Sequence, residues 1–157
     1  MLVTPDGPAW ADVTIPNPDP LWEDDVGRAS WWVGELWSAA LADLGVDPSS
    51  MRVHHGRMVR RSLGALVCFA GLAHGEVSVD GAKLVGVAQR RTRIGALFQC
   101  AVLLEWEPDS LLDALGRPAI GEVGELAVGL RRLVPGVSLA DIEAAFERVL
   151  DAYVTSS

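Results

Sequence analysis

The chain is short of cysteine, of long apolar runs and of positive charge, and each shortage excludes a class of protein. Two cysteines, Cys68 and Cys100, cannot form a disulfide framework, so we expect both to be thiols in a reducing compartment. No apolar run approaches the ~20 residues of a membrane-spanning helix and no signal-peptide pattern is found, which predicts a cytoplasmic protein without a membrane partner. The net charge of −8 argues against nucleic acid as a partner, because phosphate neutralisation supplies most of such affinity.

Lysine is almost absent as well. Lys83 is the only lysine among the 13 basic residues, and it lies in residues 81–86, Gly-Ala-Lys-Leu-Val-Gly. Lysine is a compact point charge on a thin flexible stem, whereas arginine is a bulky planar fork. We therefore predict that position 83 requires an ammonium group and not merely a positive charge.

Positive charge is concentrated in the middle of this acidic chain. Between Arg52 and Arg93 there are seven arginines and Lys83, and the only acidic residues there are Glu76 and Asp80. Such a segment would attract an anion, for example an adenylate, a carboxylate or an acidic protein surface. The alternative interpretation is a set of solvated arginines on strand edges and loops.

The segment around Lys83 has the pattern of a β-hairpin. Residues 76–80 alternate polar and apolar, Asp80-Gly81 is a favoured two-residue loop, and residues 84–88 form the return strand. A glycine inside a strand, here Gly86, often marks a bulge or a close approach of a ligand to the backbone. We expect Lys83 near the start of the return strand, with little contribution to the core. A plain surface hairpin with a solvated lysine is the alternative.

The remaining patterns predict an α+β fold in a single domain. A helix over residues 26–44 has an apolar stripe that Trp31 and Trp32 cannot both join, and Gly45 and Pro48 end it. A capping box of Ser138 and Asp141 starts a C-terminal helix. Further strands are expected at residues 9–15, 51–55, 66–69 and 96–104, and further helices at 108–115 and 123–130. Clustered strands with flanking helices indicate a sheet covered by helices.

The lysine hairpin and its flanks resemble the lipoate/octanoate branch of the biotin/lipoate protein ligase superfamily. In that branch a hairpin Val-Asp/Glu-Gly-x-Lys-hydrophobic-x-Gly-x-Ala-Gln-Arg carries a lysine that touches the acyl group and the adenylate phosphate. The residues that match this pattern, and that would bind the ligand, are Gly81, Lys83, Gly86, Ala88, Gln89 and Arg90. The resemblance runs from about residue 9 to the C-terminus, so it implies that residues 1–157 are one partial catalytic domain with a mixed, mostly antiparallel sheet.

The resemblance implies a specific chemistry. ATP, with Mg²⁺, would activate lipoate or octanoate as an acyl-adenylate, and a lysine of an acceptor lipoyl domain would attack the acyl carbon. Lys83 would then be catalytic, because a positioned ammonium stabilises the charge that develops on the phosphate and acyl oxygens. No bound metal site is predicted, since His54 and His55 are not supported by a further cluster of metal ligands.

Two other functions are compatible with the same residues. Related octanoyltransferases carry a catalytic cysteine the same distance before the hairpin lysine, 83 − 68 = 15 residues, where Cys68 lies here. Such an enzyme takes the acyl group from an acyl carrier protein as a thioester and needs no ATP. Cys68 is equally compatible with a small buried apolar residue, and Cys100 is expected in the core. The third possibility is a non-catalytic binding or accessory subunit.

One element of the family is missing. Its members carry Arg-Arg-x-Ser/Thr-Gly-Gly-Gly upstream of the strand that corresponds to residues 9–15, and this run has no counterpart in the chain. We therefore expect a missing N-terminal segment or subunit, or self-association, to accompany the chain. Whether the chain is an active enzyme by itself is left open by the sequence.

Overall fold

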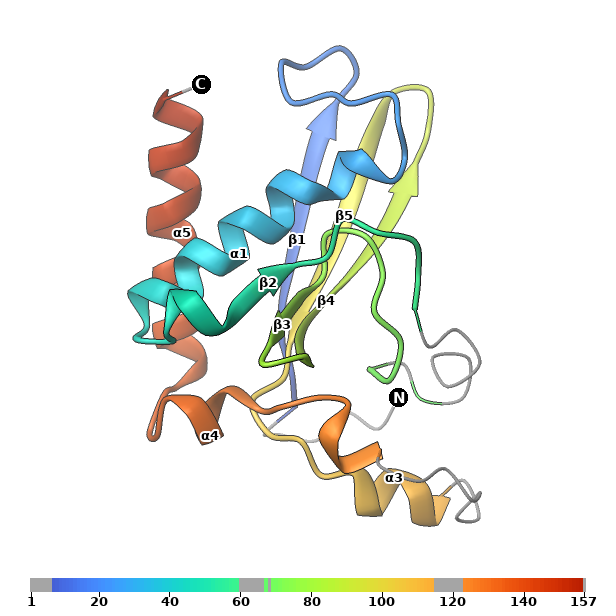
Figure 1. The fold of residues 1–157 in the computed structure, drawn as a ribbon. Coiled ribbons are helices and arrows are strands. Elements are labelled where there is room, and N and C mark those ends of the chain that lie inside the picture. Colours follow the sequence, from blue (N-terminus) through green and yellow to red (C-terminus); the bar gives the residue numbers. More distant parts are fainter. Residues whose placement is uncertain (1–6, 60–66, 68, 115–122, 157) are drawn as a thin grey trace.

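The computed structural model describes residues 7–59, 67, 69–114 and 123–156. Five antiparallel strands form one sheet in the order β1-β5-β4-β3-β2 (Figure 1). The strands are β1 (Ala9–Pro16), β2 (Met51–Val53), β3 (Val77–Val79), β4 (Ala82–Arg91) and β5 (Gly95–Val102). The α-helices are α1 (Trp31–Asp43), α3 (Pro108–Ala114), α4 (Leu130–Leu133) and α5 (Leu139–Ser156). The predicted α+β fold is confirmed. No helix within the described ranges combines the length and the apolar character needed to span a membrane.

The main core lies between α1, α5 and one face of the sheet, where the two helices pack beside each other (Figure 1). Trp32 meets Phe98 of β5 edge to face at 5.5 Å between ring centroids, and Trp37 stacks on Phe146 of α5 at 4.2 Å. Trp31 lies outside this stripe and packs against His55 at 4.4 Å. The prediction that the two adjacent tryptophans separate is therefore confirmed.

The other face of the sheet is less covered. Side chains alternate along a strand, so residues beside Phe98 and Cys100 in β5 face away from the helices. Across β4, β5 and β1 the rows on this second face are Gly86–Ala101–Trp10, Ala88–Gln99–Asp12 and Arg90–Leu97–Thr14. Trp10 is 50% exposed, and it lies on β1, the edge strand of the described sheet.

Two predicted elements are wrong. Val67 and Phe69, the described residues of the expected strand 66–69, lie in a bend and a turn. The expected helix 123–130 is a 3₁₀ turn over Val123–Glu125 followed by an extended segment, in which Ala127 forms a parallel bridge with Lys83. The backbone of Lys83 donates to the Leu126 carbonyl at 2.9 Å and accepts from the Val128 N–H at 2.9 Å. Pairing with β4 thus outweighed the helical pattern, because buried backbone groups require partners.

Local signals account for the elements that were predicted well. The Ser138 hydroxyl and Asp141 carboxylate bond at 2.6 Å at the start of α5, which confirms the capping box. Asp80 and Gly81 have φ values of 48° and 85°, and they close the β3–β4 hairpin as a two-residue loop. Positive φ at both central positions is the geometry of a type I′ turn, whose twist matches that of the two strands.

Replacement of Gly81 by alanine should therefore destabilise the fold. We expect Gly81→Ala to lower the free energy of unfolding by about 1 kcal/mol, because a Cβ disfavours the left-handed conformation. Urea denaturation measures the effect. Gly124→Ala is the control, since Gly124 also has open space around it but has no positive φ. Equal effects of the two substitutions would contradict the assignment of the turn.

Candidate functional site

A β-bulge in β4 positions Lys83. Val77 pairs with Val85, but Ser78 pairs with Lys83, so Leu84 is an extra residue in β4. In a regular strand, residues three apart point to opposite faces, and a bulge changes this alternation. Lys83 and Gly86 consequently share the face that points away from α1 and α5. A Cβ on Gly86 would lie 3.3 Å from the Lys83 Cε atom and 3.2 Å from Cζ of Phe69.

The ammonium group of Lys83 is buried and ion-paired. Lys83 is 3% exposed, and its Nζ donates to Oε1 of Glu76 at 2.7 Å and to the Gly71 carbonyl at 3.1 Å. The ring of Phe69 lies beside the same ammonium, with its centroid 4.8 Å from Nζ. The expectation of a hairpin lysine that contributes little to the core is wrong, because the charge is enclosed by protein groups.

Glu76 is the site residue that the sequence analysis missed. It is 5% exposed, and its carboxylate also accepts from the Ala73 N–H at 2.7 Å and from the Val87 N–H at 3.3 Å. The alternation of residues 76–80 suggested a solvent-facing polar row, whereas Ser78 is buried too. The available signal was that Glu76 is one of very few acidic residues in a basic segment. A buried lysine requires such a partner.

The structure separates the other predicted ligand-binding residues into three places. Gly86, Ala88 and Arg90 share the face of Lys83, and Ala88 and Arg90 are exposed. Gln89 lies on the opposite face, beside Phe98, and its Nε2 is buried without a hydrogen-bond partner. Gly81 is exposed at the tip of the hairpin. Lys83, Gly86, Ala88 and Arg90 therefore form the coherent part of the predicted set.

The cysteines and arginines differ in what the structure shows of them. Cys68 lies outside the described residues. Cys100 is fully buried in the core as expected, and burial raises the pKa of its thiol to about 11. Arg91 was expected to be exposed, but its guanidinium packs over the ring of Trp22 at 4.3 Å. Arg93 is exposed at the turn between β4 and β5.

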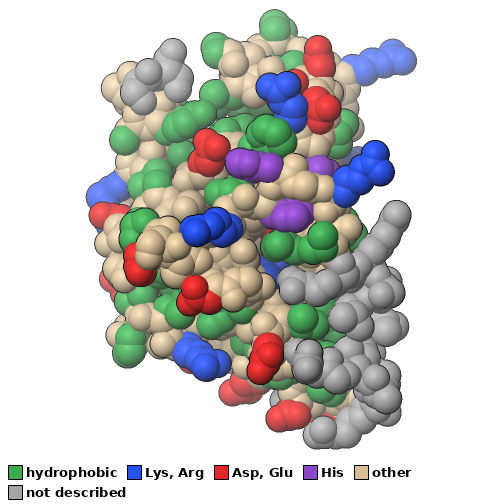
Figure 2. Space-filling model, in the orientation of Figure 1, with side chains coloured by type: hydrophobic (Ala, Val, Ile, Leu, Met, Phe, Trp, Pro, Cys, Tyr) green, Lys and Arg blue, Asp and Glu red, His purple; other side chains and the backbone are tan. Residues whose placement is uncertain are grey.

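The described residues contain no cluster of three or more His, Cys, Asp or Glu side chains that could hold a metal ion. His54 instead bonds through Nε2 to the Arg57 carbonyl at 3.0 Å, and His55 stacks on Trp31. On the helix-bearing side of the molecule, acidic and basic side chains are interspersed (Figure 2). That side does not present the concentrated positive charge that the middle of the sequence suggested.

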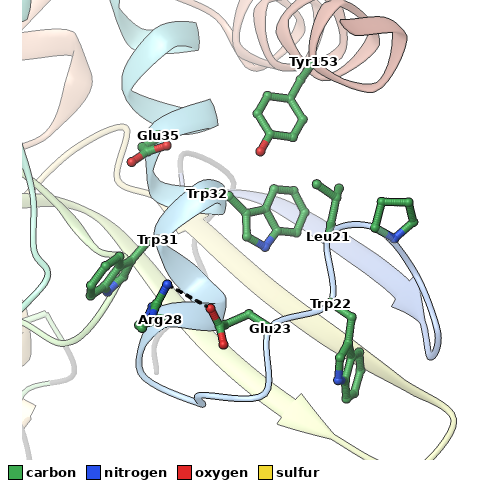
Figure 3. Close-up of a pocket in the computed structure, with 9 residues that line it drawn as sticks. Leu21, Trp22, Glu23, Arg28, Trp31, Trp32, Glu35 and Tyr153 are labelled. Carbon is green, nitrogen blue, oxygen red and sulfur yellow. Dashed lines mark ion pairs between the residues drawn. The ribbon is translucent and has the colours of Figure 1, made fainter. Parts of the chain in front are cut away.

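A separate hollow of ≈ 320 Å³ lies where the β1–α1 connector, α1 and the C-terminal end of α5 meet (Figure 3). Arg28 and Glu23 form an ion pair across part of it at 3.3 Å. Its lining consists of Pro20, Leu21, Trp22, Glu23, Arg28, Trp31, Trp32, Glu35 and Tyr153. No predicted ligand-binding residue lines this hollow, which is therefore distinct from the Lys83 cluster.

The fold of the chain is that of lipoate-protein ligases. A bi-partite lipoate protein ligase from Thermoplasma acidophilum, described with its E2 lipoyl domain, matches with a TM-score of 0.67 and 18% identity over 95% of this chain and 52% of that chain. Lipoate-protein ligase A bound with ATP matches with a TM-score of 0.65 and 18% identity over 92% and 51%. Protein Ta0514 from T. acidophilum with bound lipoic acid gives 0.64 and 17% over 92% and 50%.

The chain thus spans about half the length of these solved structures. No protein-family model and no curated protein sequence matches it. The likeness is therefore one of three-dimensional fold, and it confirms the fold that the resemblance of the lysine hairpin implied.

Disruption of the buried ion pair should be costly, and removal of both charges much less so. We expect Lys83→Met or Glu76→Gln alone to lower the free energy of unfolding by about 3 kcal/mol, because each leaves a buried charge without its partner. The double variant should cost less than the sum of the two. Urea denaturation of all four proteins measures the coupling. Arg148→Ala, which breaks the exposed pair with Asp43, should cost less than about 1 kcal/mol.

Cys100 should make the fold sensitive to alkaline pH. Its pKa is raised by burial from 9.0 to about 11, so the protonated thiol is favoured in the folded state. The associated stability is complete below about pH 9 and is lost as the pH rises toward 11. Comparison of urea midpoints at about pH 8 and pH 10.5 should show a smaller fall in Cys100→Ala than in the wild type. An identical fall in both proteins would contradict the prediction.

Proposed function

We propose that the chain is a partial catalytic domain of the lipoate-protein ligase type, which binds a lipoyl- or octanoyl-adenylate on the sheet face that carries Lys83. The carrying observation is the ammonium of Lys83, which is held by Glu76 and Gly71 beside a row of small side chains. The lipoate-protein ligase fold supports the assignment, as do the lipoic acid and the ATP bound to two of the similar proteins.

The second face of the sheet offers a suitable surface for an acyl chain. Gly86 and Ala101 leave the strands low in profile, and Trp10 adds an exposed apolar ring at the end of their row. An octanoyl or lipoyl chain is apolar and would bury its surface there. Arg90 lies four residues beyond Gly86, roughly 13 Å along the strand. At that distance it can contact the adenylate or an acceptor lipoyl domain.

Lys83 would act electrostatically in the reaction. Charge develops on the acyl oxygen and on the phosphate oxygens during adenylate formation and acyl transfer, and a preorganised ammonium stabilises it. The attacking nucleophile is the lysine of the acceptor lipoyl domain, so the chain itself needs none. ATP and lipoate or octanoate are substrates. Since the described residues show no cluster of metal ligands, Mg²⁺ would enter with ATP.

A second polypeptide segment would complete the site. The similar structures are about twice as long as this chain, and one of them is described as bi-partite. Here β1 is an edge strand with the half-exposed Trp10 on its open face, and free strand edges invite pairing. We propose that the partner is the missing N-terminal segment or a separate subunit, with self-association as the alternative. We place the assembly in the cytoplasm, where lipoyl domains would be its acceptors.

Binding of an acyl-adenylate analogue tests the proposal. The octyl ester of AMP should bind the wild type and should bind Lys83→Met/Glu76→Gln about tenfold to a hundredfold more weakly, because a charge-assisted hydrogen bond is lost. This double variant keeps the site free of unpaired charge, so it should fold. Arg93→Gln removes an exposed positive charge at the far end of β4 and is the control. Calorimetry gives the affinities.

The uniqueness of Lys83 provides a direct second readout. Selective ¹⁵N labelling of lysine gives one side-chain signal, which should shift when the analogue binds. Binding without such a shift would place the ligand elsewhere. Incubation with an octanoyl acyl carrier protein distinguishes the transferase. A thioester on Cys68 detected by mass, and absent in Cys68→Ser, would replace the ligase proposal with an ATP-independent transferase.

A further inference from the structure

We propose that Glu76 sets the charge of the ligand that Lys83 accepts, in favour of an acyl carbonyl or a singly charged acyl phosphate over a polyphosphate. The inference rests on the proposed function, because it names the ligand class of the same site. It starts from the finding that the lone lysine of the chain is not a free positive charge. Its ammonium is 2.7 Å from a carboxylate that is equally buried.

The carboxylate of Glu76 is fixed in place. One oxygen accepts from the Ala73 N–H at 2.7 Å, and the other accepts from both Lys83 Nζ and the Val87 N–H. These donors come from the loop before β3 and from β4, so movement of the carboxylate would leave two backbone N–H groups without partners. Such groups are costly to leave unpaired when buried. An incoming anion therefore cannot readily displace Glu76.

The ammonium has one side on which a ligand can replace a weaker contact. Of its three N–H donors, two are directed to Glu76 and to the Gly71 carbonyl. The ring of Phe69 covers the remaining approach at 4.8 Å. A cation–π contact is weaker than a charge-assisted hydrogen bond, so a ligand oxygen would displace the ring and leave the ion pair intact. Gly86 carries no side chain that would obstruct this approach.

The ligand then meets an ammonium whose charge is already compensated. Both side chains are buried, so the field of the Glu76 carboxylate is weakly screened by water or salt. A carbonyl oxygen or a single negative charge still gains a hydrogen bond from Lys83. Each additional negative charge on the ligand experiences net repulsion from Glu76. The site thus favours the acyl-adenylate over a free polyphosphate.

Glu76→Gln tests the inference with ligands of increasing charge. The probes are the octyl ester of AMP, with one negative charge, then AMP and ATP. Relative to the wild type, the variant should bind AMP and ATP on the order of tenfold or more tightly, and the octyl ester within about threefold. Glu143→Gln, an exposed position on α5, is the matched control and should change none of the affinities. An equal change for all three probes would show a merely structural role and would overturn the inference.

A second measurement needs no variant. The octyl ester of ADP carries more charge than the octyl ester of AMP with the same alkyl chain, and the wild type should bind it at least tenfold more weakly. Equal or tighter binding overturns the inference even if Glu76→Gln does not fold. If the wild type binds no probe while Glu76→Gln binds AMP, the proposed function fails and the role of Glu76 stands. If neither protein binds any probe, both proposals are wrong.

Discussion

The ion pair between Lys83 and Glu76 is the interaction around which this part of the molecule is organised. Two charges removed from water are tolerated only when they are close together and when their remaining donors and acceptors are paired. The chain meets this demand with the bulge at Leu84, the carbonyl of Gly71 and the N–H groups of Ala73 and Val87. Gly86 leaves the necessary room.

The two faces of the sheet have different tasks. The face toward α1 and α5 supplies the apolar core through large rings such as Trp37 and Phe98. The face with Lys83 carries small residues, exposed polar groups and the half-exposed Trp10. A stable core on one side allows the other side to remain open for a ligand or a further polypeptide. This division fits a chain that spans half the length of the ligases whose fold it shares.

Arginine and lysine are used for different purposes here. Arg91 and Arg28 lie over the rings of Trp22 and Trp31, where a planar guanidinium packs well. These contacts are structural, and they explain part of the basic segment without an anionic ligand. Lys83 has the one position where a narrow stem reaches a buried carboxylate and a carbonyl at the same time. The scarcity of lysine was therefore informative, although for a reason that includes its burial.

The sequence by itself determined the features whose physics is local. The Asp80-Gly81 turn, the alternation of the strands and the Ser138–Asp141 cap depend on residues within a few positions of each other, so their patterns identified them. The resemblance of the lysine hairpin was enough to name the fold.

Only the tertiary structure decided that Lys83 is buried, that Glu76 is its partner and that residues 126–128 extend beside β4 instead of continuing a helix. The physical reason is that burial and backbone pairing depend on segments distant in sequence, and the same hairpin in isolation would leave its lysine in water.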